Sequence, residues 1–150
     1  MNKIVRFIFC IVLFITASAG CSKQAVGNSD IDEMFSELPQ TFSLENPTDK
    51  EKFEKMTSIT FHSDQTAVLA TPLISSYMLP KCTYQVSDNE LKVCAAIKNE
   101  WEEGFFGVKN GDVIAVFTII DSKTLKFKSA SVPIFADENA EYIKKQEESQ

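Results

Sequence analysis

Residues that carry catalytic chemistry are scarce in this chain. It has one histidine, His62, and five glycines among 150 residues. His62 lies beside Ser63-Asp64, so an exposed turn residue is expected there rather than a general base. No cluster of His and Cys has metal-ligand spacing, and no glycine-rich loop of the kind that cradles phosphate occurs. The sequence therefore predicts no catalytic residues, no metal site, no cofactor and a protein that is not an enzyme.

Positive charge is also limited. The chain has 15 Lys and Arg against 21 Asp and Glu, and its formal net charge is −6. An acidic surface is repelled by phosphate backbones and by anionic lipid headgroups. We therefore expect no nucleic-acid partner, and we expect any membrane attachment to depend on an acyl chain rather than on a basic patch.

The N-terminal apolar run is too short to span a bilayer, which takes about 20 residues. The run Phe7–Ile15 follows two cations, Lys3 and Arg6, and precedes a stretch of small residues. This order is typical of a secretory signal peptide. Residues 1–20 are therefore expected to be an export signal that is removed from the mature protein.

Cys21 decides between two ways of processing that signal. Ser18-Ala19-Gly20-Cys21 resembles the lipobox of bacterial lipoproteins, although Ser18 replaces the usual aliphatic residue. Ala17-Ser18-Ala19 alternatively fits an ordinary signal peptidase site. Cleavage there would leave an odd number of cysteines in an oxidising compartment, which favours lipidation of Cys21. The resemblance implies a lipid anchor in the bacterial cell envelope, at the outer membrane and facing the periplasm, because Ser22 is not the retaining Asp.

The mature chain has the length of one domain. Residues 21–29 are polar and small, as a tether requires. Residues 30–136 are expected to form the folded domain, and residues 137–150 a polar C-terminal tail.

Two short helices are predicted near the start of the domain. Apolar residues recur at helical spacing before Pro39, at Ile31, Met34, Phe35 and Leu38. Thr48 and Glu51 then have the spacing of a capping box, with Phe53 and Met56 on a small apolar face. Each pattern predicts an amphipathic helix that packs on the core of the domain.

From Ser58 onward the apolar period changes from helical to two, which predicts β-hairpins. A two-residue turn at Asp64-Gln65 would pair Phe61 with Val68, and a turn at Asp88-Asn89 would pair Val86 with Leu91. Asn110-Gly111 is typical of a type I′ turn and predicts a hairpin between strands Phe105–Val108 and Val113–Ile119.

The hairpin segments "SITFHSDQTAVL" and "YQVSDNELKV" resemble the small lipocalin-like domains of bacterial lipoproteins, with Gln65 in place of the usual turn glycine. The expected fold is mainly β: an antiparallel meander that curls into a small lipocalin-like barrel, with one or two short N-terminal helices. The resemblance implies a barrel with a site for a small apolar ligand or a protein partner.

Cys82 and Cys94 are the remaining pair of cysteines in the mature chain. Export favours a disulfide between them. The predicted hairpin register opposes it, because Cys94 would face Thr83 and point away from Cys82. We expect the bridge to form through irregular chain that follows Pro80.

Two functional classes remain. The favoured one is a non-enzymatic, envelope-anchored binding or protein-interaction module, with Trp101, Phe105 and Phe106 as its candidate surface for a partner or ligand. The alternative is a secreted carboxylate-dependent hydrolase that uses a loop around Trp101. Three carboxylates flank that ring, from Glu100, Glu102 and Glu103.

Overall fold

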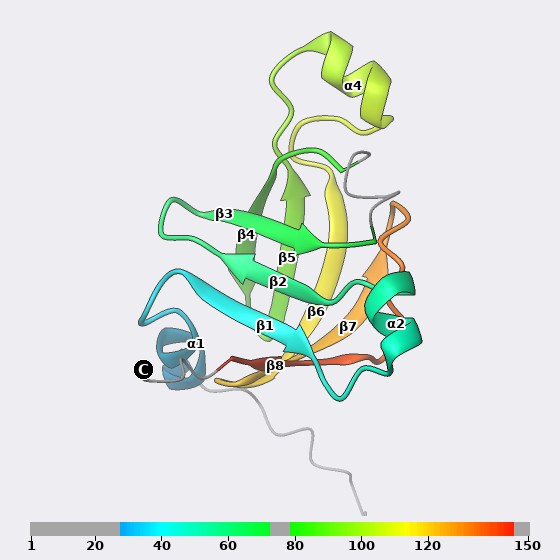
Figure 1. Cartoon of the computed structure of the whole chain (residues 1–150). Coiled ribbons are helices and arrows are strands. Elements are labelled where there is room, and N and C mark those ends of the chain that lie inside the picture. The colour runs from blue at the N-terminus through cyan, green and yellow to red at the C-terminus, as the bar shows by residue number, and fades with distance from the viewer. Residues whose placement is uncertain (1–27, 73–78, 146–150) are drawn as a thin grey trace, which may run out of the picture.

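The chain folds into a closed antiparallel barrel, shown in Figure 1. The computed structural model describes residues 28–72 and 79–145. The strands follow in chain order, and each pairs with the next: β1 Gln40–Leu44, β2 Ser58–Phe61, β3 Thr66–Ala70, β4 Cys82–Ser87, β5 Glu90–Ala95, β6 Val113–Asp121, β7 Thr124–Ala130 and β8 Glu141–Lys144. β8 pairs with β1 and closes the ring. The predicted fold, a mainly β meander closed into a small lipocalin-like barrel, is confirmed.

Large apolar side chains fill the barrel interior. The largest of those that are fully buried include Phe42, Phe61, Phe117, Leu91, Ile114, Leu125 and Tyr142. Phe117 meets the rings of both Phe127 and Tyr142 edge to face, with centroids 5.6 and 5.9 Å apart. Such pairs add about 0.5–1.5 kcal/mol each to the burial of the rings. In the part of the chain that the structure describes, these buried side chains pack the interior of the barrel.

Helix α1 (Asn28–Met34) lies at one end of the barrel. Met34 is fully buried in the core, and Ile31 packs against it. Phe35 stacks on Tyr84 at 5.3 Å and meets Phe61 edge to face at 5.5 Å. The predicted apolar stripe thus packs on the domain's own core, although the helix ends at Met34, earlier than expected.

Helix α2 (Asp49–Glu54) begins with the predicted capping box. The Thr48 hydroxyl accepts a hydrogen bond from the Glu51 amide, and the Glu51 carboxylate accepts one from the Thr48 amide. The predicted apolar face is only half right. Met56 is buried, but Phe53 is 81% exposed because the helix ends too soon to present a full face to the core.

The first hairpin differs from its predicted register by one residue. Phe61 pairs with Ala67, and Thr60 pairs with Val68. The His62 amide donates a 2.9 Å hydrogen bond to the Thr66 carbonyl, so the loop has three residues and ends at Gln65 with φ +62°. A shift of one residue turns each side chain to the other face, and Val68 is therefore exposed. The hairpin of β4 and β5 has the predicted register, with Val86 opposite Leu91.

The predicted hairpin at Asn110-Gly111 is wrong. Residues 100–106 form a helix, α4 (Glu100–Phe106), and β6 pairs with β5 and β7 instead. Gly111 has φ +84° and is the third residue of a turn closed by the Asp112 amide and the Lys109 carbonyl at 3.1 Å. This is the position of a type II turn that favours glycine.

The predicted boundary of the domain at residue 136 is also wrong. β8 lies within residues 137–150, the segment expected to be a polar tail, and it is the strand that closes the barrel. Tyr142 is fully buried, and its hydroxyl donates a 3.1 Å hydrogen bond to the Met56 carbonyl. A strand with one deeply buried side chain among charged neighbours gives almost no alternation by which to predict it.

Candidate functional site

Helix α4 is specified by local capping on both sides. The Asn99 side chain accepts a 3.0 Å hydrogen bond from the Glu102 amide, and the Glu102 carboxylate accepts a 2.9 Å bond from the Lys98 amide. Gly107 follows the helix with φ +69°, and its amide donates to the Glu103 carbonyl at 2.8 Å. An Asn cap, a Glu three residues later and a Gly after the last turn are helix signals that the sequence analysis missed.

α4 projects from the end of the barrel opposite to α1 (Figure 1). Phe106 attaches it, because this half-buried ring packs against the barrel core. Phe106 also meets Phe105 edge to face, with centroids 5.0 Å apart. The sequence predicts a loop around Trp101, whereas the structure places this residue on a helix.

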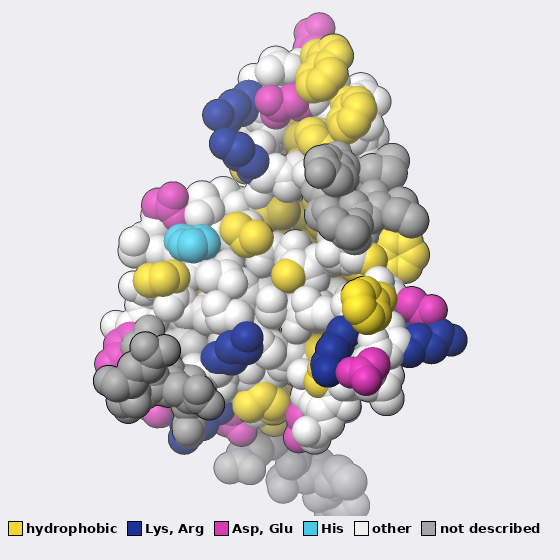
Figure 2. All heavy atoms as spheres, viewed as in Figure 1, with side chains coloured by type: hydrophobic (Ala, Val, Ile, Leu, Met, Phe, Trp, Pro, Cys, Tyr) yellow, Lys and Arg dark blue, Asp and Glu magenta, His cyan; other side chains and the backbone are white. Residues whose placement is uncertain are grey.

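Trp101 and Phe105 form an exposed aromatic pair on α4. Their ring centroids are 5.3 Å apart with an interplanar angle of 12°. Trp101 is 72% exposed and Phe105 54% exposed. Figure 2 shows hydrophobic side chains gathered on one side of this projection. We call Trp101 and Phe105 the aromatic patch, with Phe106 as its support; the structure thus brings together the residues that the sequence analysis named.

Acidic residues surround the aromatic patch. Glu100, Glu102 and Glu103 belong to the first turn of α4, and the last turn has no basic residue. Glu102 caps the helix, whereas Glu100 and Glu103 make no ion pair with any residue that the structure describes. The carboxylates proposed for a hydrolase are therefore a helix cap and two solvated side chains.

Cys82 and Cys94 are free thiols in the structure, so the expected disulfide is not formed. Cys82 pairs with Ala95 and Thr83 pairs with Cys94, which directs the two thiols to opposite faces of the β4–β5 ladder. Cys82 faces the barrel core, and its thiol donates to the Pro80 carbonyl at 3.2 Å. Burial raises the pKa of the Cys82 thiol to about 12 and also raises the pKa of Cys94. Neither thiol has the low pKa of a redox-active cysteine.

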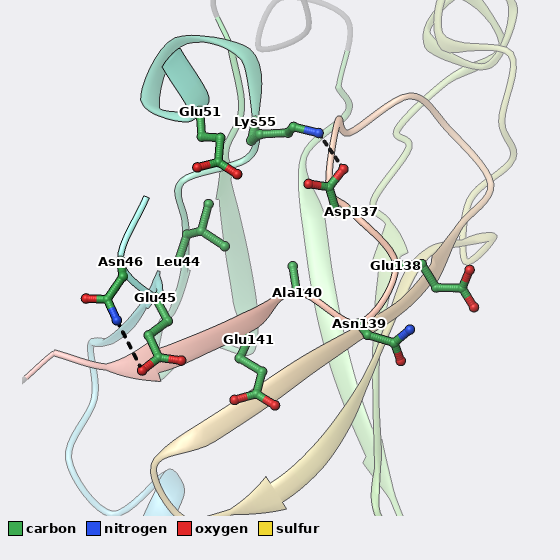
Figure 3. Close-up of a pocket in the computed structure, with 10 residues that line it drawn as sticks. All are labelled: Leu44, Glu45, Asn46, Glu51, Lys55, Asp137, Glu138, Asn139, Ala140 and Glu141. Carbon is green, nitrogen blue, oxygen red and sulfur yellow. Dashed lines mark hydrogen bonds and ion pairs between the residues drawn. The ribbon is translucent and has the colours of Figure 1, made fainter. Parts of the chain in front are cut away.

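A polar pocket lies between the end of β1, α2 and the chain before β8 (Figure 3). Lys55 and Asp137 form an ion pair across it, and this contact raises the pKa of the lysine. The Glu51 carboxylate is used by the α2 cap, which lowers its pKa. Figure 3 shows Glu138 pointing away from the ion pair. Within the described residues, no group of three or more His, Cys, Asp or Glu is arranged to hold a metal ion.

An apolar groove also lies beside α2. Phe53, Pro72, Phe135 and Ala136 line it, together with the ion pair of Lys55 and Asp137. Phe53 and Phe135 are both exposed. Both rings line the groove, and among the described residues no ring contact joins them as one joins Trp101 to Phe105.

Cys21, the predicted lipidation site, lies outside the described residues, as does the predicted signal segment. Among residues 28–72 and 79–145, no helix has the length and apolar character needed to cross a bilayer.

Comparisons with known proteins give no assignment. The chain matches no family model, no curated protein and no solved structure.

Proposed function

We propose that this protein is a lipid-anchored interaction module of the bacterial cell envelope, and that it binds a partner protein through the aromatic patch. The observation that carries the proposal is the stacked, exposed pair of Trp101 and Phe105 on a projecting helix. The few residues that dominate binding at protein interfaces are enriched in tryptophan, and aromatic residues in general are enriched at the cores of interfaces. Exposed aromatic residues grouped at one place on a surface mark such interfaces.

The packed interior of the barrel favours a protein partner over a small apolar ligand. Ligand sites are cavities of several hundred Å³ that enclose most of the ligand. Here fully buried rings such as Phe42, Phe61 and Phe117 occupy the centre of the barrel. A ligand inside the barrel would have to displace them, whereas a protein can dock on α4 without disturbing the core.

The position of α4 also fits an anchored module. Cys21 precedes the first described residue, Asn28, by seven residues (28 − 21), which span at most about 25 Å. A lipid on Cys21 would keep the α1 end of the barrel close to the membrane. α4 lies at the opposite end and would present the aromatic patch away from the bilayer, toward the periplasm.

The lipid anchor has its own test. Metabolic labelling with a fatty acid should mark the wild-type chain and fail to mark Cys21→Ser. An unlabelled wild-type chain that begins at Gly20 would contradict the anchor.

Quantitative affinity capture tests the interaction. The full-length chain, extracted in mild detergent from cells that produce it, is compared with the double variant Trp101→Ala/Phe105→Ala. The proposal predicts at least one envelope protein that the wild type enriches and the double variant loses.

The control variant is Phe53→Ala, which removes an exposed ring at the other apolar groove. It should retain the same partner. Identical capture by the wild type and the double variant would contradict the assignment of the function to the aromatic patch.

A further inference from the structure

Gly104 leaves a position without a side chain on the exposed surface of α4, and we call this position the notch. Gly104 follows Glu100 by four residues and Trp101 by three, so it lies on the helix surface between them. A Cβ built at Gly104 meets no atom within 4 Å. The spacing along the helix thus places a carboxylate on one side of this open position and the aromatic patch on the other.

The charge around this notch has one sign. From residue 98 to residue 112 the chain carries four carboxylates against two amines: Glu100, Glu102, Glu103 and Asp112 against Lys98 and Lys109. The Glu102 carboxylate caps α4, and the Asp112 carboxylate accepts a hydrogen bond from the Lys109 amide. Glu100 and Glu103 make no ion pair with any described residue, so their charges remain available to a partner. In Figure 2 acidic side chains lie beside the hydrophobic group on this projection, and lysines lie on its other side.

We infer that the aromatic patch receives a partner surface that presents arginine beside apolar side chains; this rests on the proposed function and specifies the chemistry of the partner. A guanidinium group stacks on aromatic rings and pairs with carboxylates through a planar fork of donors. Helical spacing places Glu100 and Trp101 on either side of the notch, so one guanidinium group can reach both a carboxylate and a ring there. Apolar side chains of the partner cover the rest of Trp101 and Phe105.

A lysine side chain of the partner should bind at the notch more weakly than an arginine side chain. An ammonium group is compact and strongly hydrated, and it does not stack on a ring as a planar group does. An acidic partner is repelled by Glu100 and Glu103, and like charges across an interface oppose binding. The site therefore discriminates among partners by charge as well as by apolar contact.

The single tryptophan of the chain makes the site directly observable. Trp101 is the only tryptophan, and its emission reports on the aromatic patch alone. The purified full chain is titrated with three short amphipathic peptides that contain no tryptophan and differ only in bearing Arg, Lys or Glu beside the same leucines. We expect a saturable blue shift of Trp101 emission with the Arg peptide, a weaker response with the Lys peptide and none with the Glu peptide.

Two variants test the notch itself. Glu100→Gln should weaken binding of the Arg peptide by about two- to fivefold, the range of an exposed ion pair. Gly104→Leu fills open space on the helix and should also weaken binding while leaving the far-UV circular dichroism unchanged. The matched control is Glu138→Gln, which removes an exposed carboxylate that lines the distant polar pocket and should leave the affinity unchanged.

The outcomes separate this inference from the proposed function. Equal responses to the Arg, Lys and Glu peptides, or no response to the Arg peptide, would overturn the inference. A cellular partner that is lost in Trp101→Ala/Phe105→Ala but is captured equally by Glu100→Gln would also overturn it, and would leave the proposed function standing. Loss of the partner in Trp101→Ala/Phe105→Ala together with reduced capture by Glu100→Gln supports both.

Discussion

Trp101 stacks on Phe105 one helical turn away, and the two rings lie within 12° of parallel although both are exposed. Residues at this spacing are neighbours on a helix surface, so the stack forms within α4 and needs no partner. The pair is thus held in one arrangement before binding. Preorganisation of this kind reduces the loss of side-chain entropy when a partner docks.

Removing the aromatic patch should leave the fold intact. Trp101→Ala/Phe105→Ala is expected to change the free energy of unfolding by no more than about 1 kcal/mol, because both rings are exposed. Phe117→Ala, in the barrel core, should cost about 3–5 kcal/mol. Urea unfolding of the three chains measures the difference. Equal losses would mean that the patch is part of the core rather than a free surface.

The turn before β6 depends on glycine at one position. Gly111→Val should destabilise the domain by about 1–3 kcal/mol, since valine is strained at φ +84° even where space is open. Gly104→Ala is the control, because Gly104 lies in helical backbone with the same open space. It should leave stability unchanged or raise it by about 1 kcal/mol. The same thermal midpoint for wild type and Gly111→Val would refute this turn geometry.

Ionisation of Cys82 should weaken the fold at high pH. The folded-state pKa of about 12 exceeds the ordinary thiol value near 8.5, so folding favours the neutral thiol. This contribution is complete below about pH 8.5 and is lost as the pH rises toward 12, by at most about 1.4 kcal/mol per pH unit.

The Cys82→Ala variant isolates that contribution. Tyr142 and Cys94 also have raised pKa values and remain in both chains, so the test is the difference between the two chains. The free-energy difference between wild type and Cys82→Ala should stay constant from pH 6 to about 8 and shift against the wild type above about pH 9. A difference that is independent of pH, or the absence of free thiols in unreduced, denatured protein, would contradict a buried free Cys82.

The hydrogen bond of Tyr142 should contribute to closure of the barrel. Tyr142→Phe leaves the Met56 carbonyl without its donor in a fully buried place, which should cost about 1–3 kcal/mol. Tyr84→Phe is a matched control, because its hydroxyl donates a longer 3.3 Å bond to the His62 carbonyl at a partly buried site. Its loss should be smaller when both are measured by chemical denaturation. A larger loss for Tyr84→Phe would reverse this ranking.

The sequence predicts the barrel better than it predicts the candidate site. Alternation of apolar residues is a signal along each strand, and the pairing of Val86 with Leu91 follows from a two-residue turn. The first hairpin shows the limit. Its loop has three residues because Gln65 adopts positive φ, a conformation that is uncommon for Gln and that turn propensity does not predict.

The sequence does not predict α4, the helix that carries the candidate site, because a stronger signal for a hairpin lies next to it. Asn110-Gly111 is the preferred pair for a type I′ hairpin, so the sequence predicts a strand at residues 105–108. The Asn110 side chain instead accepts a 3.0 Å hydrogen bond from the Ile97 amide, which joins the two ends of the α4 segment. This contact joins residues that are distant in the sequence, and it does not produce a periodic pattern of apolar residues from which it could be predicted. The residues of the aromatic patch were nevertheless predicted, because large rings beside charged residues are conspicuous in any backbone conformation.

Site-specific photocrosslinking in cells tests the central claim most directly. A photoreactive benzoylphenylalanine replaces Phe105 in the full-length chain. A second chain carries it at Phe53 of α2, whose ring is more exposed than that of Phe105. Irradiation should join position 105 to one specific envelope protein and leave position 53 without that adduct. Adducts of position 105 with lipid or with a second copy of this chain, or the same protein adduct from both positions, would contradict a partner-binding site on α4.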